Sequence, residues 1–301
     1  MEPTVVIETK KLTKYYGKQV GVIDLDLAVN RGEVFGYLGP NGAGKSTTIK
    51  LLLNFINPTG GSMTVFGNDP QKQSTSILSD VGYIPGEIHM YDTLSGRDHL
   101  KFQASLQGGV DWKYVKKLAS RLQVNLAKPI KSLSHGNKQK IAIIAAFMHQ
   151  PKLLILDEPT TGLDPLIQRE FYDLVSEVNQ AGSTFFISSH VLPEVERMCH
   201  RVGILKEGNL IVTEEIETLK KRAVRSLEIQ FAKEIKPQDL KGIGGIRDLQ
   251  IKENIARCRV EGSLDQFIKQ ISKYEVINLI TQEADLEQVF LNYYKKDKNA
   301  A

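Results

Sequence analysis

A glycine-rich segment between an apolar run and a helical pattern is the feature that most constrains the fold of this chain. The run Val34 to Leu38 predicts a buried strand, and the run Gly44 to Phe55 has apolar residues at helical spacing and no proline. The residues that lead into the helix fit the phosphate-binding pattern G-x-x-x-x-G-K-S/T: Gly39, Pro40, Asn41, Gly42, Ala43, Gly44, Lys45 and Ser46. Strand, loop and helix in this order predict an α/β fold with a site for phosphate groups.

The residue types of this loop suit an anionic ligand. Glycines allow backbone N–H groups to turn inward around phosphates, and the dipole of the following helix favours anions. In this pattern Lys45 reaches the β and γ phosphates of a nucleotide, and the hydroxyl of Ser46 is a magnesium ligand. The position between a strand and a helix argues against an accidental glycine-rich turn.

Two acidic residues follow a second apolar run. Leu153 to Leu156 predicts a buried strand that leads into Asp157 and Glu158. Two acids after a strand are commonly solvated or cap a helix, but ligands of parallel α/β sheets bind at the C-terminal ends of strands, and the phosphate loop favours a catalytic role. We expect Asp157 to hold magnesium through water and Glu158 to orient or deprotonate the attacking water.

The remaining pattern predicts an α/β part with a helical insertion. Helical periodicity runs from about Leu94 to Gln150, and strands alternate with helices again after Pro151, which predicts a largely parallel sheet. Asn57 to Gly61 is predicted to be a loop. The other expected strands are Val5 to Glu8, Val20 to Val29, Thr184 to Ser188, Val202 to Lys206 and Asn209 to Thr213, and the expected helices are Pro165 to Gln180 and Val191 to Cys199.

A boundary is expected near Lys221, followed by a small α+β domain. Its expected strands lie near Leu227 to Phe231, Arg247 to Ile251, Ala256 to Val260 and Val276 to Thr281, and its expected helices are Ser263 to Ile271 and Leu286 to Tyr294. No phosphate-binding or carboxylate motif occurs beyond His190, so this domain is expected to regulate or dimerise rather than to catalyse.

One further motif resembles the signature of a protein family. The sequence Leu133-Ser134-His135-Gly136-Asn137, just upstream of Asp157 and Glu158, is similar to the Leu-Ser-Gly-Gly-Gln signature of ATP-binding cassette proteins. The resemblance covers about Thr4 to Lys221 and is closest to subunits that drive export-type permeases. It implies a P-loop nucleotide-binding cassette with a mixed sheet core over residues 1–221, a helical insertion at about 87–150, and a small C-terminal α+β domain over 222–301.

The resemblance also implies roles for single residues. Tyr16 would stack on adenine with Val20 beside the base, Asp164 would couple the two sites of a dimer while also capping a helix before Pro165, and His190 would sense the γ-phosphate. Ser134 and Gly136, before a helix, would face the γ-phosphate held by the opposite subunit, although Ser134 also suits a helix cap. The implied catalytic residues are Lys45, Glu158 and His190, and the implied ATP-binding residues are Tyr16, Gly39, Pro40, Asn41, Gly42, Ala43, Gly44, Lys45, Ser46, Thr47, Ser134 and Gly136.

This chain departs from the family's pattern in two places. His135 and Asn137 replace the commonest signature residues while Ser134 and the second glycine are kept. After Val81 to Pro85 the family usually has a glutamine, where this chain has Gly86 followed by Glu87. Either Glu87 replaces that glutamine as a metal ligand, or magnesium uses Ser46, phosphates and waters. A charged loop residue such as Glu87 is otherwise expected to be exposed.

Composition limits the remaining alternatives. The longest apolar stretch, Ile141 to Met148, is far below the roughly 18 residues of a membrane-spanning helix, and Met1 to Lys10 lacks the features of a secretory signal. Cys199 and Cys258 have no metal-ligand spacing and are expected to be reduced thiols. A net charge of +4, mixed along the chain, does not indicate a nucleic-acid partner.

The resemblance finally implies cofactors, partners and a location. These are ATP and Mg²⁺, a homodimer or a heterodimer with a similar cassette, and a separately encoded transmembrane permease, with the chain peripheral on the cytoplasmic face of the membrane. An alternative is a soluble cassette ATPase that remodels ribosomes or DNA, but such proteins commonly have two cassettes or a long inserted coiled coil, and this chain has one motif set and no sustained heptads. An inactive regulatory cassette is disfavoured by the presence of Lys45, Asp157, Glu158 and His190.

Overall fold

The computed structural model describes residues 4–222, 224–240, 246–261 and 264–282 and divides the chain into two units, Met1–Glu214 and Glu215–Ala301. The sequence pattern places the boundary near Lys221, whereas the structure assigns the helix that contains this residue to the second unit. Each unit has its own buried apolar cluster. The two units are therefore described separately.

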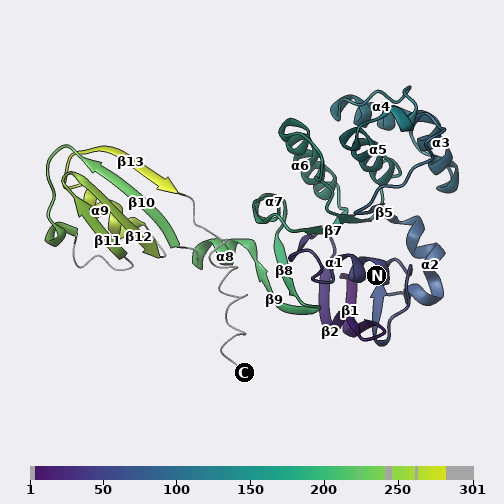
Figure 1. The fold of residues 1–301 in the computed structure, drawn as a ribbon, viewed down its shortest axis with the longest axis horizontal. Coiled ribbons are helices and arrows are strands. Elements are labelled where there is room, and N and C mark those ends of the chain that lie inside the picture. The colour runs from purple at the N-terminus through teal and green to yellow at the C-terminus, as the bar shows by residue number, and fades with distance from the viewer. Residues whose placement is uncertain (1–3, 223, 241–245, 262–263, 283–301) are drawn as a thin grey trace. The chain divides into compact units, whose positions relative to one another are not determined.

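A six-stranded sheet forms the centre of the first unit (Figure 1). Its order is β5 (Val81–Ile84), β6 (Leu153–Asp157), β7 (Thr184–Ser189), β3 (Val34–Leu38), β8 (Arg201–Lys206) and β9 (Asn209–Glu215). The pairings from β5 to β8 are parallel. Every side chain of β3, β6 and β7 is buried, as expected for a parallel sheet covered on both faces. The loops at the C-terminal ends of these strands share one edge of the sheet.

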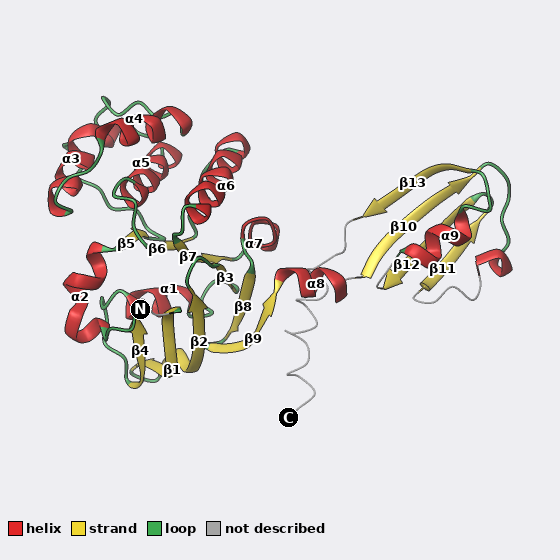
Figure 2. Ribbon diagram, turned by 180° about the vertical axis from the view of Figure 1, so that it is seen from behind, coloured by secondary structure: helices red, strands yellow, loops and turns green. Residues whose placement is uncertain are grey.

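A second sheet in this unit is antiparallel, with the order β2 (Gln19–Asn30), β1 (Val5–Tyr16) and β4 (Gly60–Val65). Helix α1 (Lys45–Leu52) lies between the two sheets, as Figure 2 shows, and its apolar residues share one buried cluster with strands of both. The phosphate-binding loop therefore leads into a helix that is held from two sides.

Helices cover the rest of the first unit. The segment between β5 and β6 forms α3 (Gly96–Leu106), α4 (Trp112–Arg121), the short 3₁₀ helix η1 (Ile130–Ser132) and α5 (His135–Phe147). The remaining helices are α2 (Pro70–Ser79), α6 (Pro165–Gln180) and α7 (Leu192–Met198). In the part of the chain that the structure describes, none of the helices combines the length and the apolar character that crossing a bilayer requires.

The second unit begins with α8 (Ile216–Arg222) and contains a four-stranded sheet with the order β11 (Ile246–Lys252), β12 (Ile255–Glu261), β10 (Val224–Phe231) and β13 (Val276–Gln282). All its pairings are antiparallel. A short 3₁₀ helix, η2 (Pro237–Leu240), follows β10, and α9 (Asp265–Ile271) packs on one face of the sheet through Phe267 and Ile271. The helix predicted from Leu286 to Tyr294 lies outside the described residues.

Two features of the first unit differ from the sequence-based expectation. The strand predicted to end at Glu8 continues to Tyr16, because β1 pairs with both β2 and β4. Gly60 and Gly61, predicted to lie in a loop, begin β4. Gly61 has a φ of +74° and passes against the carbonyl of Lys11, so glycine is needed there for close strand contact rather than for a turn.

Candidate functional site

The phosphate-binding loop has the backbone that its glycines predict. Gly42 and Gly44 adopt φ values of +82° and +108°, which residues with a side chain rarely adopt. A side chain at Gly44 would also clash with the carbonyl of Gly21. Gly44 directly precedes α1, so the N–H groups of the first helical turn begin at Lys45 and Ser46.

Lys45 is held inside this loop. Its side chain is 5% exposed, and its Nζ donates to the carbonyl oxygens of Gly39 at 2.7 Å and Pro40 at 3.1 Å. The same Nζ lies 3.4 Å from Glu158 Oε1. The loop thus fixes a cation beside the carboxylate that the sequence assigns to the attacking water.

A cavity of about 320 Å³ opens over the loop. Its lining comprises Tyr16, Gln19, Val20, Gly21, Asn41, Gly42, Gly44, Lys45, Ser46, Thr47 and Glu158. Tyr16 is 46% exposed, so its ring has a free face for a planar base, and Lys14 Nζ lies 5.4 Å from the ring centroid. The neighbouring Tyr15 is not part of the lining.

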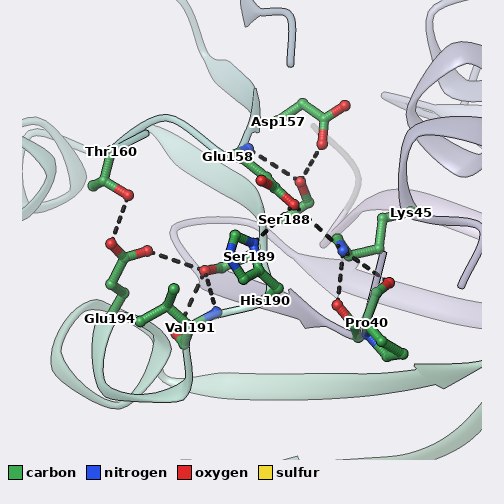
Figure 3. A network of polar contacts seen from close by, with 11 residues as sticks. Pro40, Lys45, Asp157, Glu158, Thr160, Ser188, Ser189, His190, Val191 and Glu194 are labelled. Carbon is green, nitrogen blue, oxygen red and sulfur yellow. Dashed lines mark hydrogen bonds and ion pairs between the residues drawn. The ribbon is translucent and has the colours of Figure 1, made fainter. Parts of the chain in front are cut away.

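Asp157 and Glu158 stand at the end of β6 in a network that reaches β7 (Figure 3). The hydroxyl of Ser188, a buried residue of β7, donates to Asp157 Oδ1. The N–H of Glu158 donates to both the carbonyl oxygen and Oγ of Ser188, each at 3.2 Å. Glu158 also has a φ of +49°, a backbone strain of about 1–3 kcal/mol that the network around it sustains.

His190 completes the cluster around Glu158. It directly follows β7, and its Nδ1 lies 3.1 Å from Glu158 Oε1, the oxygen that also faces Lys45. The ammonium group of Lys45, at the start of α1, and the imidazole of His190, after β7, therefore converge on one carboxylate oxygen at the edge of the cavity. The sequence predicts these residues individually, and the structure brings them together.

Four polar residues of the network were not predicted from the sequence. Ser188 bridges the two strand ends, and the carboxylate of Glu194 accepts hydrogen bonds from the hydroxyls of Thr160 and Ser189. Serine and threonine near strand ends and a glutamate in the first turn of a helix are common, so the sequence carries no signal that separates these residues from solvated ones.

Ser134 and Gly136 lie outside the cavity of their own chain. Ser134 caps α5, with its Oγ accepting from the backbone N of Asn137 at 3.4 Å and from Asn137 Nδ2 at 3.1 Å. Gly136 and His135 pack against Gly162 in the loop after Glu158. Asp164 caps α6 by accepting from the N–H of Ile167 at 3.1 Å.

Gly86, not Glu87, lies next to Asp157. A Cβ atom at Gly86 would be 3.2 Å from Asp157 Oδ2, whereas the side chain of Glu87 is 92% exposed and lies 3.8 Å from His89 Nε2. The structure therefore does not bring Glu87 to the carboxylate cluster. Burial and the negative charge of Asp157 raise the pKa of nearby Tyr83 to about 12, which keeps this phenol neutral.

Comparison with known proteins identifies the family. The family model described as "ABC transporter" matches residues 22–161. The bacitracin transport ATP-binding protein BcrA of Enterococcus faecalis is 35% identical over 297 residues, which cover 97% of this chain and 96% of the relative. The chain belongs to the ABC transporter family.

Other relatives of this ABC protein agree with the assignment. The linearmycin resistance ATP-binding protein LnrL of Bacillus subtilis (strain 168) is 31% identical, with 95% of this chain and 97% of the relative covered. A solved ATP-binding subunit of an ABC transporter is similar in structure, with a TM-score of 0.66, 30% identity, and coverage of 72% of this chain and 92% of that chain. The predicted family, the cassette fold and the ATPase activity of an ABC subunit are confirmed, and the nucleotide is ATP.

Proposed function

We propose that this ABC ATPase pairs with a second cassette and drives a separately encoded membrane-spanning permease, in the direction of export. The observation that supports active ATP hydrolysis is the convergence of Lys45 and His190 on Glu158 Oε1 at the edge of the cavity. The names of the relatives, which refer to bacitracin transport, linearmycin resistance and Nod factor export, support the direction. They favour a transporter over the remodelling of ribosomes or DNA.

The chain's own residues divide the hydrolytic work. Lys45 neutralises charge on the β and γ phosphates, and the phosphate loop from Gly39 to Thr47 binds them through N–H groups. Glu158 orients the attacking water and accepts its proton, because the carboxylate is fixed at the strand end and faces the cavity. His190 binds the γ-phosphate and holds Glu158 in place. Tyr16 stacks on adenine.

The donor set at the strand ends fits Mg²⁺. Ser46 contributes a hydroxyl and Asp157 contributes a carboxylate whose Oδ2 faces the small residue Gly86, and hard oxygen ligands are those that Mg²⁺ prefers. We assign the ion to Ser46 and Asp157, where it would neutralise charge on the transferred phosphoryl group. Glu87 joins this set only if its loop changes conformation, since its side chain is exposed in this structure.

The second cassette supplies the missing face of each ATP site. Ser134 is exposed at the N-terminus of α5, and neither it nor Gly136 lines the cavity of its own chain. Both therefore suit a γ-phosphate held by another subunit, with Asp164 at the same contact. The partner is a second copy or a similar cassette.

Mixed dimers test this arrangement. Chains with Ser134→Arg and chains with Lys45→Ala should each be inactive alone, because both composite sites of each homodimer lose one element. In a mixed dimer one site keeps both elements and the other loses both, so mixing should restore ATP hydrolysis. A mixture no more active than the separate variants would refute the shared site.

An apolar groove beside Gly86 is the surface that we assign to the permease. It has a volume of about 300 Å³ and is lined mainly by β5, the segment after it, α3 and α5, including Tyr83, Pro85, Ile88 and Leu106. It lies next to the segment that touches Asp157, so a cytoplasmic apolar segment of the permease bound here would sense the ATP site. The chain would then be peripheral on the cytoplasmic membrane face. Leu106→Glu, at a 72% exposed position, should keep purified ATPase activity and lose co-purification with the permease.

The second unit regulates or dimerises the cassette in this proposal. It has its own core, and the proposed catalytic residues all lie in the first unit. A chain truncated after Lys221 should still bind ATP. A folded truncated chain that binds none would show that the second unit belongs to the site.

A further inference from the structure

Glu194, in the first turn of α7, connects the loop after Glu158 with the end of β7, which precedes His190. Its Oε1 accepts a hydrogen bond from Thr160 Oγ1 at 2.6 Å, and its Oε2 accepts one from Ser189 Oγ at 3.0 Å. Figure 3 shows the carboxylate between these two hydroxyls. One carboxylate oxygen therefore has its donor in the loop after Glu158, and the other has its donor at the end of β7.

Thr160 provides the link to Glu158 and to the signature helix. It lies in the loop that follows Glu158 and is 4% exposed. The preceding residue is held from α5, because Gln139 Nε2 donates to the carbonyl oxygen of Pro159 at 2.7 Å, and Gln139 is also buried. A shift of α5 would therefore reach Thr160 through Pro159.

Ser189 provides the link to His190. Its hydroxyl accepts from the N–H of Val191 at 2.9 Å while donating to Glu194, so it closes a turn around His190. The imidazole of His190 is 46% exposed, so the surrounding residues cover only part of it. Its position against Glu158 depends on the backbone that this turn holds.

Removal of the Glu194 carboxylate would leave buried hydroxyls without their acceptor. Thr160 is 4% and Ser189 2% exposed, and buried polar groups are costly when unpaired. The hydroxyl of Ser189 would still accept from the N–H of Val191, but its only remaining acceptor would be Val191 O, at 3.4 Å. The turn around His190 and the loop after Glu158 would then no longer be connected by hydrogen bonds to the same carboxylate.

We propose that Glu194 is a positioning residue that sets His190 against Glu158 and passes movement of α5 and the Pro159–Asp164 loop to His190. The inference rests on the proposed roles of Glu158 and His190. It predicts that loss of Glu194 slows the chemical step and leaves ATP binding intact, because Glu194 does not line the ATP cavity.

Steady-state and single-turnover hydrolysis by the full chain test this role. Glu194→Ala should lower kcat on the order of 10²-fold, the typical cost of displaced catalytic groups, with KM for ATP changed by less than about threefold. Glu194→Gln should recover most of the rate, because an amide can accept from one hydroxyl and donate to the other. Glu170→Gln is a matched control on the partly buried ion pair with Arg121, away from the ATP cavity, and should change neither parameter.

The same substitution in a His190→Ala chain separates a positioning role of Glu194 from a general loss of structure. If Glu194 acts through His190, Glu194→Ala should lower kcat by less than about threefold in a His190→Ala chain. An equal fold loss with and without His190 would overturn the proposal, and so would a Glu194→Ala chain with parental kcat.

A shape-conserving variant covers the case in which Glu194→Ala does not fold. Thr160→Val removes one donor to Glu194 without a change in side-chain size, and should lower kcat while keeping the parental circular dichroism spectrum. Parental kcat in Thr160→Val would reject the link through Thr160. If Glu158→Gln hydrolyses ATP at the parental rate, the catalytic assignment itself fails; if only the Glu194 and Thr160 variants do, this inference alone fails.

Discussion

Glu158→Gln is the substitution that most directly tests the catalytic site. The amide keeps the length and shape of the side chain but loses the proton-accepting oxygen and the negative charge that faces Lys45 and His190. Lys45 keeps its hydrogen bonds to Gly39 and Pro40, so the phosphate loop should retain its shape and its affinity for ATP.

The expected loss is confined to the chemical step. Loss of a general base costs about 10²–10⁴-fold in rate, and at about 1.4 kcal/mol per tenfold this corresponds to roughly 3–6 kcal/mol of barrier height. Glu158→Gln should therefore bind ATP with a Kd within about threefold of the parental value while its single-turnover rate falls by that factor. Because ATP then persists between the subunits, the variant should accumulate as an ATP-bound dimer.

The assay combines phosphate release in a single turnover, fluorescent-nucleotide binding and light scattering with ATP present. Glu170→Gln, which removes the α6 carboxylate of a partly buried ion pair with Arg121 of α4, serves as the charge-matched control and should behave as the parental chain. Hydrolysis by Glu158→Gln at the parental rate would remove Glu158 from the catalytic role, and the significance of its contacts with Lys45 and His190 would have to be reconsidered.

Three further substitutions test other parts of the first unit. Gly162→Ala should lower the free energy of unfolding by about 1–3 kcal/mol, measured in urea, because φ is +76° and the new Cβ would lie 2.5 Å from the imidazole of His135. Adding His135→Gly removes the clash with the imidazole but not the backbone strain, so it should recover only part of the lost stability. Glu87→Ala should leave the Mg²⁺ concentration needed for half-maximal activity of the purified ATPase unchanged, because this exposed residue is no metal ligand in the structure. A higher Mg²⁺ requirement in Glu87→Ala would show that Glu87 is a metal ligand. Burial lowers the pKa of His99, so below about pH 6.5 the unfolded chain binds more protons than the folded chain and the free energy of unfolding falls as the pH drops. His99→Gln should make this decline smaller, measured as the shift of the urea midpoint between pH 7 and pH 5.

The sequence predicts the elements whose residues carry a local pattern. The continuous apolar runs at β3 and β6 and the glycine loop before Lys45 define strand, loop and helix without reference to the rest of the chain. Where pairing across the chain decides the structure, the local pattern misleads. Gly60 and Gly61 resemble a turn but form β4 because they fit against β1, and the largely polar α2 was not predicted because it lacks an apolar stripe.

In the candidate site, too, residues in local motifs were predicted and residues that act through contacts between distant segments were not. Motifs predict Lys45, Glu158 and His190, because the residues of each motif lie within one short segment of the sequence. Glu194 has no such motif, because its role depends on one hydroxyl from the loop after Glu158 and another from the end of β7. The left-handed backbone of Glu158 was not predicted either, since nothing in its residue type calls for it.

Ser188 joins the ends of β6 and β7 by both its main chain and its side chain, at a fully buried position. The amide of Glu158 can therefore exchange its hydrogen with solvent only after it has left both acceptors on Ser188. Its exchange rate should report how often the ends of β6 and β7 separate, and so how firmly the sheet holds the catalytic carboxylate in place.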